Sequence, residues 1–237
     1  MLPGPMPPYL RPMAPTAVDA ILCGDPARAL AIAQDLFTEP RMSNHNRGLW
    51  GYFGSLPNGS QMTVQATGIG GASAAVVLEA LAERGLRRAV RVGSATSRDA
   101  EPQVGSLIAV SRVWARDGAS AAYGAAPGDD LVPDPVLTSH LAAGCRGTAE
   151  LVSLSRPQPG ERDARGPGAG AGAVYDMQSA ALLAVSERNR VELGIGVVVT
   201  RNSGGPLEDD PHEAASIELG RTAAAALSGR RAHAESA

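Results

Sequence analysis

Arginine and glycine recur together where β-prone runs of the sequence give way to turns. The pairs are Gly24 with Arg28, Arg91 with Gly93-Ser94, and Thr200 with Arg201. Arg91 lies inside the apolar run Ala89–Val92, where a guanidinium is costly to bury unless a carboxylate or another anion meets it. The planar arginine fork matches carboxylate and phosphate oxygens. Several arginines around one site therefore favour a small oxyanion, such as free phosphate or a carboxylate.

The common nucleotide-binding motifs are absent from the chain. No P-loop occurs, and the turn Gly68-Ile69-Gly70-Gly71 lacks the glycine spacing of a dinucleotide fold. No acidic residue stands where a ribose clamp is expected, so cofactor-dependent hydride transfer is disfavoured. Taken singly, the segment Gly24–Arg28 is more typical of an ordinary strand-to-helix turn, and Arg47 of a solvated surface charge. The prediction of an anion site depends on the pairs acting together.

The stretch from Met62 to Ser94 organises the predicted fold. Met62–Ala66 alternates in the manner of a strand, Thr67–Ser73 is a glycine-rich turn, and apolar residues at helical spacing follow until Gly85. A second strand, Ala89–Val92, comes next. Such a unit builds a parallel sheet whose ligand sites lie at the carboxyl ends of the strands. The arginine and glycine pairs are therefore expected to converge on one crevice.

Similar patterns predict further elements on both sides of this unit. Asp25 and Pro26 suit the N-cap and first position of a helix that follows the strand Val18–Cys23. Further strands are predicted at Val104–Val113, Glu150–Ser155 and Leu193–Thr200, a hairpin at Leu49–Val64, a turn at Ala115–Ser120, and helices at Ala29–Leu36, Pro135–Ala143, Ala180–Asn189 and His212–Leu227. We interpret residues 156–173, rich in glycine and proline, as a mobile loop suited to act as a lid.

The predicted organisation is one α/β domain over residues 18–228, with a proline-rich arm before it (1–17) and a flexible tail after it (229–237). A chain of 237 residues is long enough to bury the core of such a domain. The net charge of −3 and the aromatic content of 3% argue against a nucleic-acid partner. The arm has no signal-peptide core, no apolar run reaches membrane-spanning length, and the two cysteines lack metal-ligand spacing. We therefore expect a cytoplasmic protein without a membrane partner or a metal.

Short fragments along the chain carry a more specific signal when they are taken in order. They are Gly24–Arg28, Arg47, Thr67–Ser73, Arg91–Ser94, Asp117–Ser120, Tyr175–Ala180 and Val197–Arg201. Each is weak alone, but their order and spacing over Asp19 to Leu227 resemble the nucleoside phosphorylase-I family, and more specifically its uridine phosphorylases.

The resemblance implies a three-layer α/β/α fold with a mixed, largely parallel central sheet, assembling into dimers and then a hexamer. It also implies reversible phosphorolysis of a uridine-like pyrimidine nucleoside, unmodified or altered at the base or the 5′ position, to free base and ribose 1-phosphate. The partners are then a nucleoside and inorganic phosphate, with phosphate as co-substrate and no other cofactor.

The resemblance also implies roles for individual residues. Phosphate binding falls to Gly24, Arg28, Arg91 and Ser94, with Arg47 reaching into a neighbouring subunit. Ribose binding falls to Ser94, Asp176, Met177 and Gln178, and base binding to Gln158, Arg162 and Arg201. The catalytic set is Arg91, Gln178 and Arg201.

Departures from the family pattern concentrate in the nucleoside half of the site. Gln178 replaces a glutamate that takes both ribose hydroxyls, and an amide carries no charge. Asp176 replaces another glutamate, which is a milder change. Thr96 replaces a glycine, which predicts a reshaped loop, and the base-cradling segment is reduced to an echo at Pro159–Arg162. Tyr9 is the candidate to replace a family histidine at the 5′ end of the sugar.

These departures keep two alternatives open. One is a purine-type phosphorylase or a nucleosidase that uses water, although the intact pair Arg28 and Arg91 argues against water. The other is a non-catalytic member that binds a nucleoside or phosphate without efficient turnover. Gln178 in place of glutamate suggests this alternative.

Overall fold

A computed structural model of the protein describes residues 9–156, 168 and 170–234. Over these residues the strands are β1 Asp19–Cys23, β2 Arg41–Asn44, β3 Gly51–Ser55, β4 Gln61–Ala66, β5 Arg88–Ser97, β6 Leu107–Arg116, β7 Asp130–Leu131, β8 Gly147–Leu154, β9 Val174–Asp176, β10 Glu192–Asn202 and β11 Gly205–Pro206. The helices are α1 Pro26–Leu36, the 3₁₀ turn η1 Asn46–Gly48, α2 Gly70–Ala82, α3 Gly118–Ala122, α4 Pro135–Gly144, α5 Ser179–Asn189 and α6 Asp209–Ala234.

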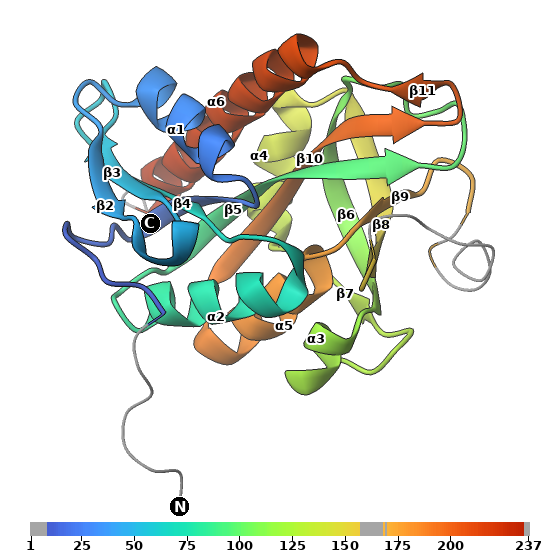
Figure 1. Ribbon diagram of the computed structural model, residues 1–237, viewed down its shortest axis with the longest axis horizontal. Coiled ribbons are helices and arrows are strands. Elements are labelled where there is room, and N and C mark those ends of the chain that lie inside the picture. Colours follow the sequence, from blue (N-terminus) through green and yellow to red (C-terminus); the bar gives the residue numbers. More distant parts are fainter. Residues whose placement is uncertain (1–8, 157–167, 169, 235–237) are drawn as a thin grey trace, which may run out of the picture.

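All the strands belong to one mixed sheet (Figure 1). The order is β11-β10-β6-β8-β9-β5-β1-β4-β3-β2, and β7 pairs with β6. β4, β1, β5 and β10 run parallel to one another, while β3 and β2 extend the sheet as an antiparallel edge. β5 pairs with both β9 and β10, so this half of the sheet closes on itself. The predicted parallel unit around residues 62–94 is confirmed.

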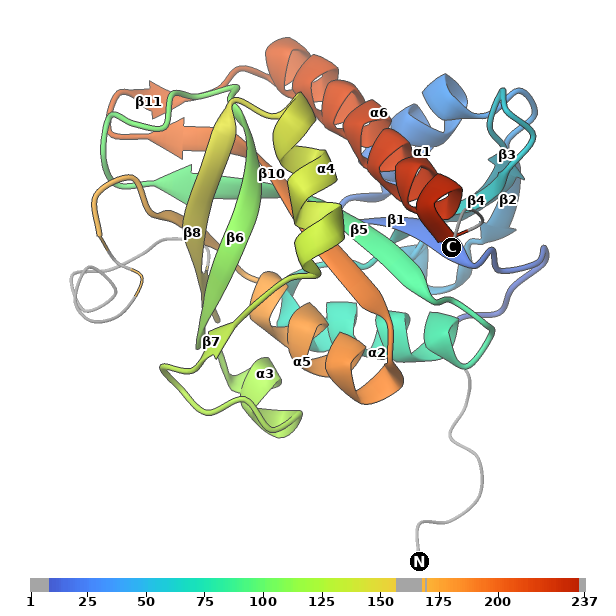
Figure 2. The ribbon, with the colours of Figure 1, turned by 180° about the vertical axis from the view of Figure 1, so that it is seen from behind.

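Helices cover the sheet on both faces and complete the predicted α/β/α sandwich. α2, α3 and α5 lie together on one face, and α1, α4 and α6 on the other, as Figure 2 shows from behind. Each layer has its own apolar core, represented by Leu78 and Leu182 on one side and by Ile32, Leu137 and Leu219 on the other. The three-layer prediction is therefore confirmed.

The start of α1 is fixed by the residues that predicted it. Asp25 is the N-cap, and its side chain accepts a hydrogen bond from the backbone N–H of Arg28 at 2.9 Å. Pro26 occupies the first turn, where its missing N–H costs nothing. Arg28 therefore leaves the first turn of α1 at the carboxyl end of β1. By contrast, α2 begins at Ile69 without a side-chain cap, next to the turn that follows β4.

The described part of the proline-rich arm packs against β2. Leu10 is 1% exposed, which makes it part of the core. The backbone N–H of Arg11 donates to Asn44 Oδ1 at 2.8 Å, and that of Met13 donates to the carbonyl of Ser43 at 2.7 Å. The strand at the sheet edge therefore anchors the described part of the arm.

Several predicted boundaries need correction. β5 spans Arg88–Ser97 rather than the predicted Ala89–Val92, because β10 and β9 continue beside it and pair with Thr96. Residues 118–122 form the short helix α3 instead of a simple turn, since Asp117 caps it. The last helix begins earlier than His212 and continues past Leu227 to Ala234, as expected of a segment rich in alanine and arginine, both strong helix formers.

Candidate functional site

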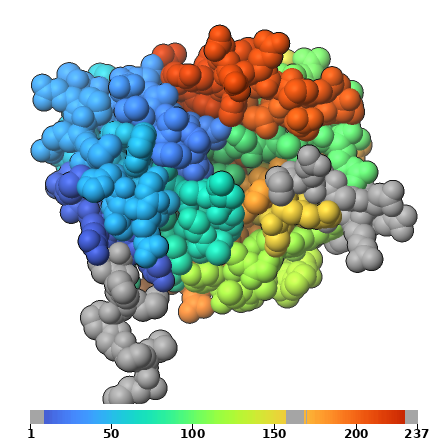
Figure 3. All heavy atoms as spheres, in the orientation of Figure 1, coloured from blue at the N-terminus to red at the C-terminus, as the bar shows by residue number. Residues whose placement is uncertain are grey.

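A cavity of about 410 Å³ opens where β1, β4 and β5 end and where β10 passes beside them. Its lining includes the predicted residues Gly24, Arg28, Arg91, Ser94, Asp176, Met177 and Gln178. Figure 3 shows α1, α2 and β5 near one another on the same face of the molecule. The carboxyl ends of parallel strands are the usual place for a ligand in such a sheet. Members of all three predicted pairs therefore meet at one crevice, but Arg201 does not line it.

A larger hollow of about 650 Å³ lies at the amino end of β10. Its lining includes the carboxylates Asp130, Asp134, Glu187 and Glu192, with Arg190 as the basic residue. This balance of charge does not suit an anion. The smaller cavity at the strand ends has two arginines and two carboxylates, and the carboxylate of Asp176 is bound to Arg91, so this cavity is the candidate site.

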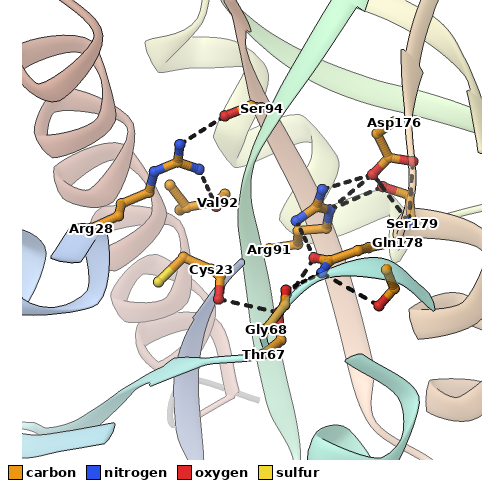
Figure 4. Close-up of polar contacts among 11 residues, drawn as sticks. Cys23, Arg28, Thr67, Gly68, Arg91, Val92, Ser94, Asp176, Gln178 and Ser179 are labelled. Carbon is orange, nitrogen blue, oxygen red and sulfur yellow. Dashed lines mark hydrogen bonds and ion pairs between the residues drawn. The ribbon is translucent and has the colours of Figure 1, made fainter. Parts of the chain in front are cut away.

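Arg28 brings a positive charge to the cavity wall. Its Nη2 donates to Ser94 Oγ at 2.7 Å, and its Nη1 lies 3.4 Å from the carbonyl oxygen of Val92 (Figure 4). Nη2 is also 2.9 Å from His212 Nε2. Burial lowers the pKa of Arg28, and the nearby Arg91 lowers it further, while Cys23 and Asp25 act in the opposite direction. Among the described residues no carboxylate forms an ion pair with Arg28.

Arg91 lies deeper, and its charge is balanced within the protein. It is 4% exposed, and its Nη2 forms an ion pair with Asp176 Oδ2 at 2.7 Å. Its Nε lies 3.2 Å from the same carboxylate oxygen and 3.1 Å from Ser179 Oγ. Asp176 is therefore the carboxylate that a buried arginine in this strand was predicted to need.

Glycine at position 93 makes room for this arrangement. Residues 91 and 93 lie on the same side of β5, because side chains alternate along a strand. A Cβ at Gly93 would lie 2.5 Å from Arg91 Cζ, well inside contact distance. The Arg-x-Gly spacing thus allows the guanidinium to fold over the strand toward Asp176.

Asp176 and Gln178 line the cavity, but their polar atoms are already engaged. Asp176 Oδ2 also accepts hydrogen bonds from the backbone N–H and the hydroxyl of Ser179, at 3.1 and 2.7 Å. Gln178 Oε1 accepts from Arg91 Nη1 at 3.0 Å and from Thr67 Oγ1 at 3.3 Å, while its Nε2 donates to the carbonyl of Gly68 at 2.6 Å. Gln178 therefore ties the turn after β4 to Arg91.

The remaining predicted residues lie apart from the cavity. Arg47 is exposed in η1 with a left-handed φ of 58°, and its guanidinium lies 5.8 Å from the ring centre of Tyr9. Arg201 is exposed and does not line the cavity, whereas its neighbour Thr200 does. Gln158 and Arg162, together with most of the predicted lid, lie outside the described residues. The reshaped loop expected at Thr96 is instead a continuous strand whose residues line the cavity.

Cys23 stands next to the cavity but is unsuited to nucleophilic chemistry. The side chain is fully buried, and burial raises the pKa of its thiol to about 12. The thiol therefore stays protonated at neutral pH. Among residues 9–156, 168 and 170–234 no cluster of three or more His, Cys, Asp or Glu side chains is arranged to hold a metal ion.

One member of the site was missed at the level of sequence. His212 comes from the first turns of α6 and meets Arg28 across 184 positions of the chain. Burial and the neighbouring Arg28 both lower the pKa of His212, so its imidazole is neutral at neutral pH. A single histidine near the start of a helix gives no signal of such a contact, because only the folded chain brings the two segments together.

Comparison with known proteins adds a family. The family profile described as Phosphorylase superfamily matches residues 19–233. The chain is 35% identical to a uridine phosphorylase of Treponema pallidum over 122 residues, which is 51% of this chain and 46% of the relative. It is 35% identical to a uridine phosphorylase of Haemophilus influenzae over 101 residues (43% and 39%), and 34% identical to a DeoD-type purine nucleoside phosphorylase of Oceanobacillus iheyensis over 89 residues (37% of each).

The chain spans less than half the length of these curated relatives. Their names include both a pyrimidine and a purine nucleoside enzyme, so both classes of base occur among the relatives. Separately, none of the helices in the described part of the chain combines the length and hydropathy needed to cross a bilayer.

The buried ion pair generates a stability prediction. Replacing Asp176 by asparagine leaves the charge of Arg91 buried without a counterion, so we expect Asp176→Asn to lower the free energy of unfolding by about 3–5 kcal/mol. The measurement is urea unfolding in phosphate-free buffer. Asp35→Asn, which removes the exposed pair with Arg221, is the matched control and should cost less than about 1 kcal/mol. Equal, small effects from both substitutions would contradict the assigned role of Asp176.

Proposed function

The chain belongs to the phosphorylase superfamily, and from that premise we propose that it catalyses the phosphorolysis of a nucleoside. In this reaction an oxygen of inorganic phosphate forms a bond to C1′ of the ribose while the N-glycosidic bond breaks. The base leaves with the bonding electron pair and takes up a proton. The products are the free base and ribose 1-phosphate, and phosphate is the only co-substrate.

The single observation that carries this proposal is the charge of Arg28. The guanidinium lines the same cavity as that of Arg91, yet only Arg91 is paired with a carboxylate among the described residues. Two nearby cations favour a bound anion, and arginine suits the oxygens of phosphate. Ser94 Oγ, which accepts from Arg28, keeps its own hydrogen to donate to that anion. Gly24 also lines the cavity.

The chemistry explains why the anion is held beside the sugar. Breaking the glycosidic bond develops positive charge on the ribose, as in other glycosyl transfers. A phosphate dianion held in place stabilises that charge and then attacks C1′. One well-placed charged or polar group is worth about 3 kcal/mol of barrier lowering in such sites.

Ribose is proposed to lie against Met177 and Gln178. The amide of Gln178 is neutral and already holds Arg91 and the Thr67-Gly68 turn. It therefore forms weaker hydrogen bonds to the sugar hydroxyls than a free carboxylate would. This engagement favours a second candidate function, in which the chain binds phosphate and a nucleoside but turns them over poorly.

The base is proposed to be a pyrimidine, as in uridine. The matches to uridine phosphorylases extend over 122 and 101 residues, against 89 for the purine enzyme. Thr96 follows Ser94 by two residues on β5, which is about 7 Å along a strand, and pairs with Tyr175. Both line the cavity, so they are the proposed contacts of the base, while Arg201 would have to approach from its exposed position.

Assembly with further copies of the chain is part of the proposal. Ile69 lines the cavity and is 87% exposed, and Arg47 is exposed on the neighbouring turn. A dimer, and from it a hexamer, would cover such residues and bring Arg47 to the site of a neighbour. The two cysteines are free thiols, which fits the proposed cytoplasmic location.

Phosphate dependence tests the reaction. We expect release of free base from uridine or a related nucleoside only when phosphate is present, measured by chromatography of the products. Arg28→Gln should lower kcat/KM for phosphate by about 100-fold, because it removes the uncompensated charge. Arg221→Gln, at an exposed arginine of α6, is the control and should keep full activity. Base release without phosphate would indicate a nucleosidase, and no release across a nucleoside panel would indicate a non-catalytic binder.

Gln178→Glu separates an efficient enzyme from a weak one. A carboxylate adds negative charge near the ribosyl cation, so turnover should rise about tenfold, which corresponds to roughly 1.4 kcal/mol. The carboxylate cannot donate to the carbonyl of Gly68, so the free energy of unfolding should fall by about 1–3 kcal/mol. Steady-state kinetics and urea unfolding check the two effects. Unchanged stability would mean that Gln178 does not hold the turn.

A further inference from the structure

We propose that His212 is a positioning residue that holds Arg28 in the orientation that binds the anion. The proposal rests on the proposed function, because it concerns the phosphate end of the same cavity. His212 does not line that cavity, so it acts through Arg28 and does not touch the substrate. No motif of the sequence assigns it a role.

The contact fixes one end of the guanidinium. Arg28 Nη2 is 2.9 Å from His212 Nε2 and 2.7 Å from Ser94 Oγ. Nη2 carries two hydrogens, so these two acceptors use both of them. The N–H groups that remain for an anion are the one on Nε and the one on Nη1 that does not face the carbonyl of Val92. The direction in which they point depends on how Nη2 is held.

The imidazole can act as the acceptor only in its neutral form, because a protonated ring has no free lone pair. The charged and titratable groups around it are Arg28 from α1, Asp25 at the start of α1, and Asp209 and Glu213 from α6. Burial and Arg28 keep the ring neutral at neutral pH, while Asp25 and Asp209 act in the opposite direction. Ser94 Oγ lies 3.4 Å from the same nitrogen.

A second hollow explains why Arg28 needs to be held. This hollow, of about 290 Å³, lies on the other side of Arg28 and is lined by Arg28 and His212 together with the carboxylates Asp25, Asp209 and Glu213. Carboxylates attract a guanidinium, so Arg28 has an alternative position away from the anion. His212 lines this hollow as well, and its contact with Nη2 holds the guanidinium beside Ser94. Without it, Arg28 is free to turn toward the carboxylates.

Asparagine and glutamine at position 212 make a matched pair of variants. The amide oxygen of glutamine can take the place of Nε2, whereas asparagine is too short to reach Arg28. We expect His212→Asn to weaken the binding of inorganic phosphate about tenfold, as for the loss of a hydrogen bond to a charged group. His212→Gln should stay within about threefold of the parent. Glu218→Gln, an exposed carboxylate of the same helix that lies outside this hollow, is the control.

The measurements are calorimetric titration with phosphate and with sulfate, and the KM values for phosphate and nucleoside in phosphorolysis. The expected result is a rise in the KM for phosphate with the KM for the nucleoside unchanged, and full recovery in His212→Gln. The double variant His212→Asn/Asp209→Asn should regain part of the lost affinity, because one competing carboxylate is gone. Thermal unfolding of each variant reports on folding separately.

The outcomes distinguish this proposal from the proposed function. Unchanged phosphate affinity in His212→Asn, an equal loss in Glu218→Gln, or no rescue by His212→Gln would overturn the role of His212. If the parent binds phosphate but releases no base, the proposed function fails while the calorimetry still tests His212. A parent that binds neither phosphate nor sulfate would overturn both.

Discussion

Two guanidinium groups share one cavity in this protein, and their charges must be compensated. Arg91 is buried inside a strand, so it requires a counterion within the fold, and Asp176 provides it at 2.7 Å. Within the described part of the chain, the hydrogen-bond partners of Arg28 are neutral, namely Ser94, the carbonyl of Val92 and His212. The fold thus balances one of the two charges and leaves the other facing the cavity. Under the proposed function, a bound phosphate completes the balance.

The surrounding structure serves this arrangement at several points. The cap by Asp25 directs the first turn of α1, and with it Arg28, toward the end of β5. The missing side chain of Gly93 gives the guanidinium of Arg91 its place over the strand. Gln178 then joins Arg91 to the turn after β4, so that three strand ends are held in one network. The cavity is therefore positioned by a helix cap, a glycine and the hydrogen bonds of one glutamine at the carboxyl edge of a parallel sheet.

Much of this could be predicted from the sequence, because it depends on local patterns. The cap at Asp25 and Pro26, the glycine turn before α2, and the buried arginine that requires a carboxylate are all visible in runs of a few residues. The extra length of β5 was not, because it depends on pairing with β9 and β10. The contact of Arg28 with His212 was invisible for the same reason, since it joins helices at opposite ends of the chain. The resemblance predicted that Gln178 binds ribose. In the structure, the hydrogen bonds of its side-chain amide go to other residues of the protein, and no sequence pattern reveals which partners a buried amide will find.

The most direct measurement is a crystal structure of the protein grown with inorganic phosphate. We expect the anion between the guanidinium groups of Arg28 and Arg91, with oxygens about 3 Å from an N–H of Arg28 and from Ser94 Oγ, the usual length of such bonds. The Arg91–Asp176 pair should remain in place. A cavity that stays empty at saturating phosphate, or an anion bound away from Arg28, would contradict the account.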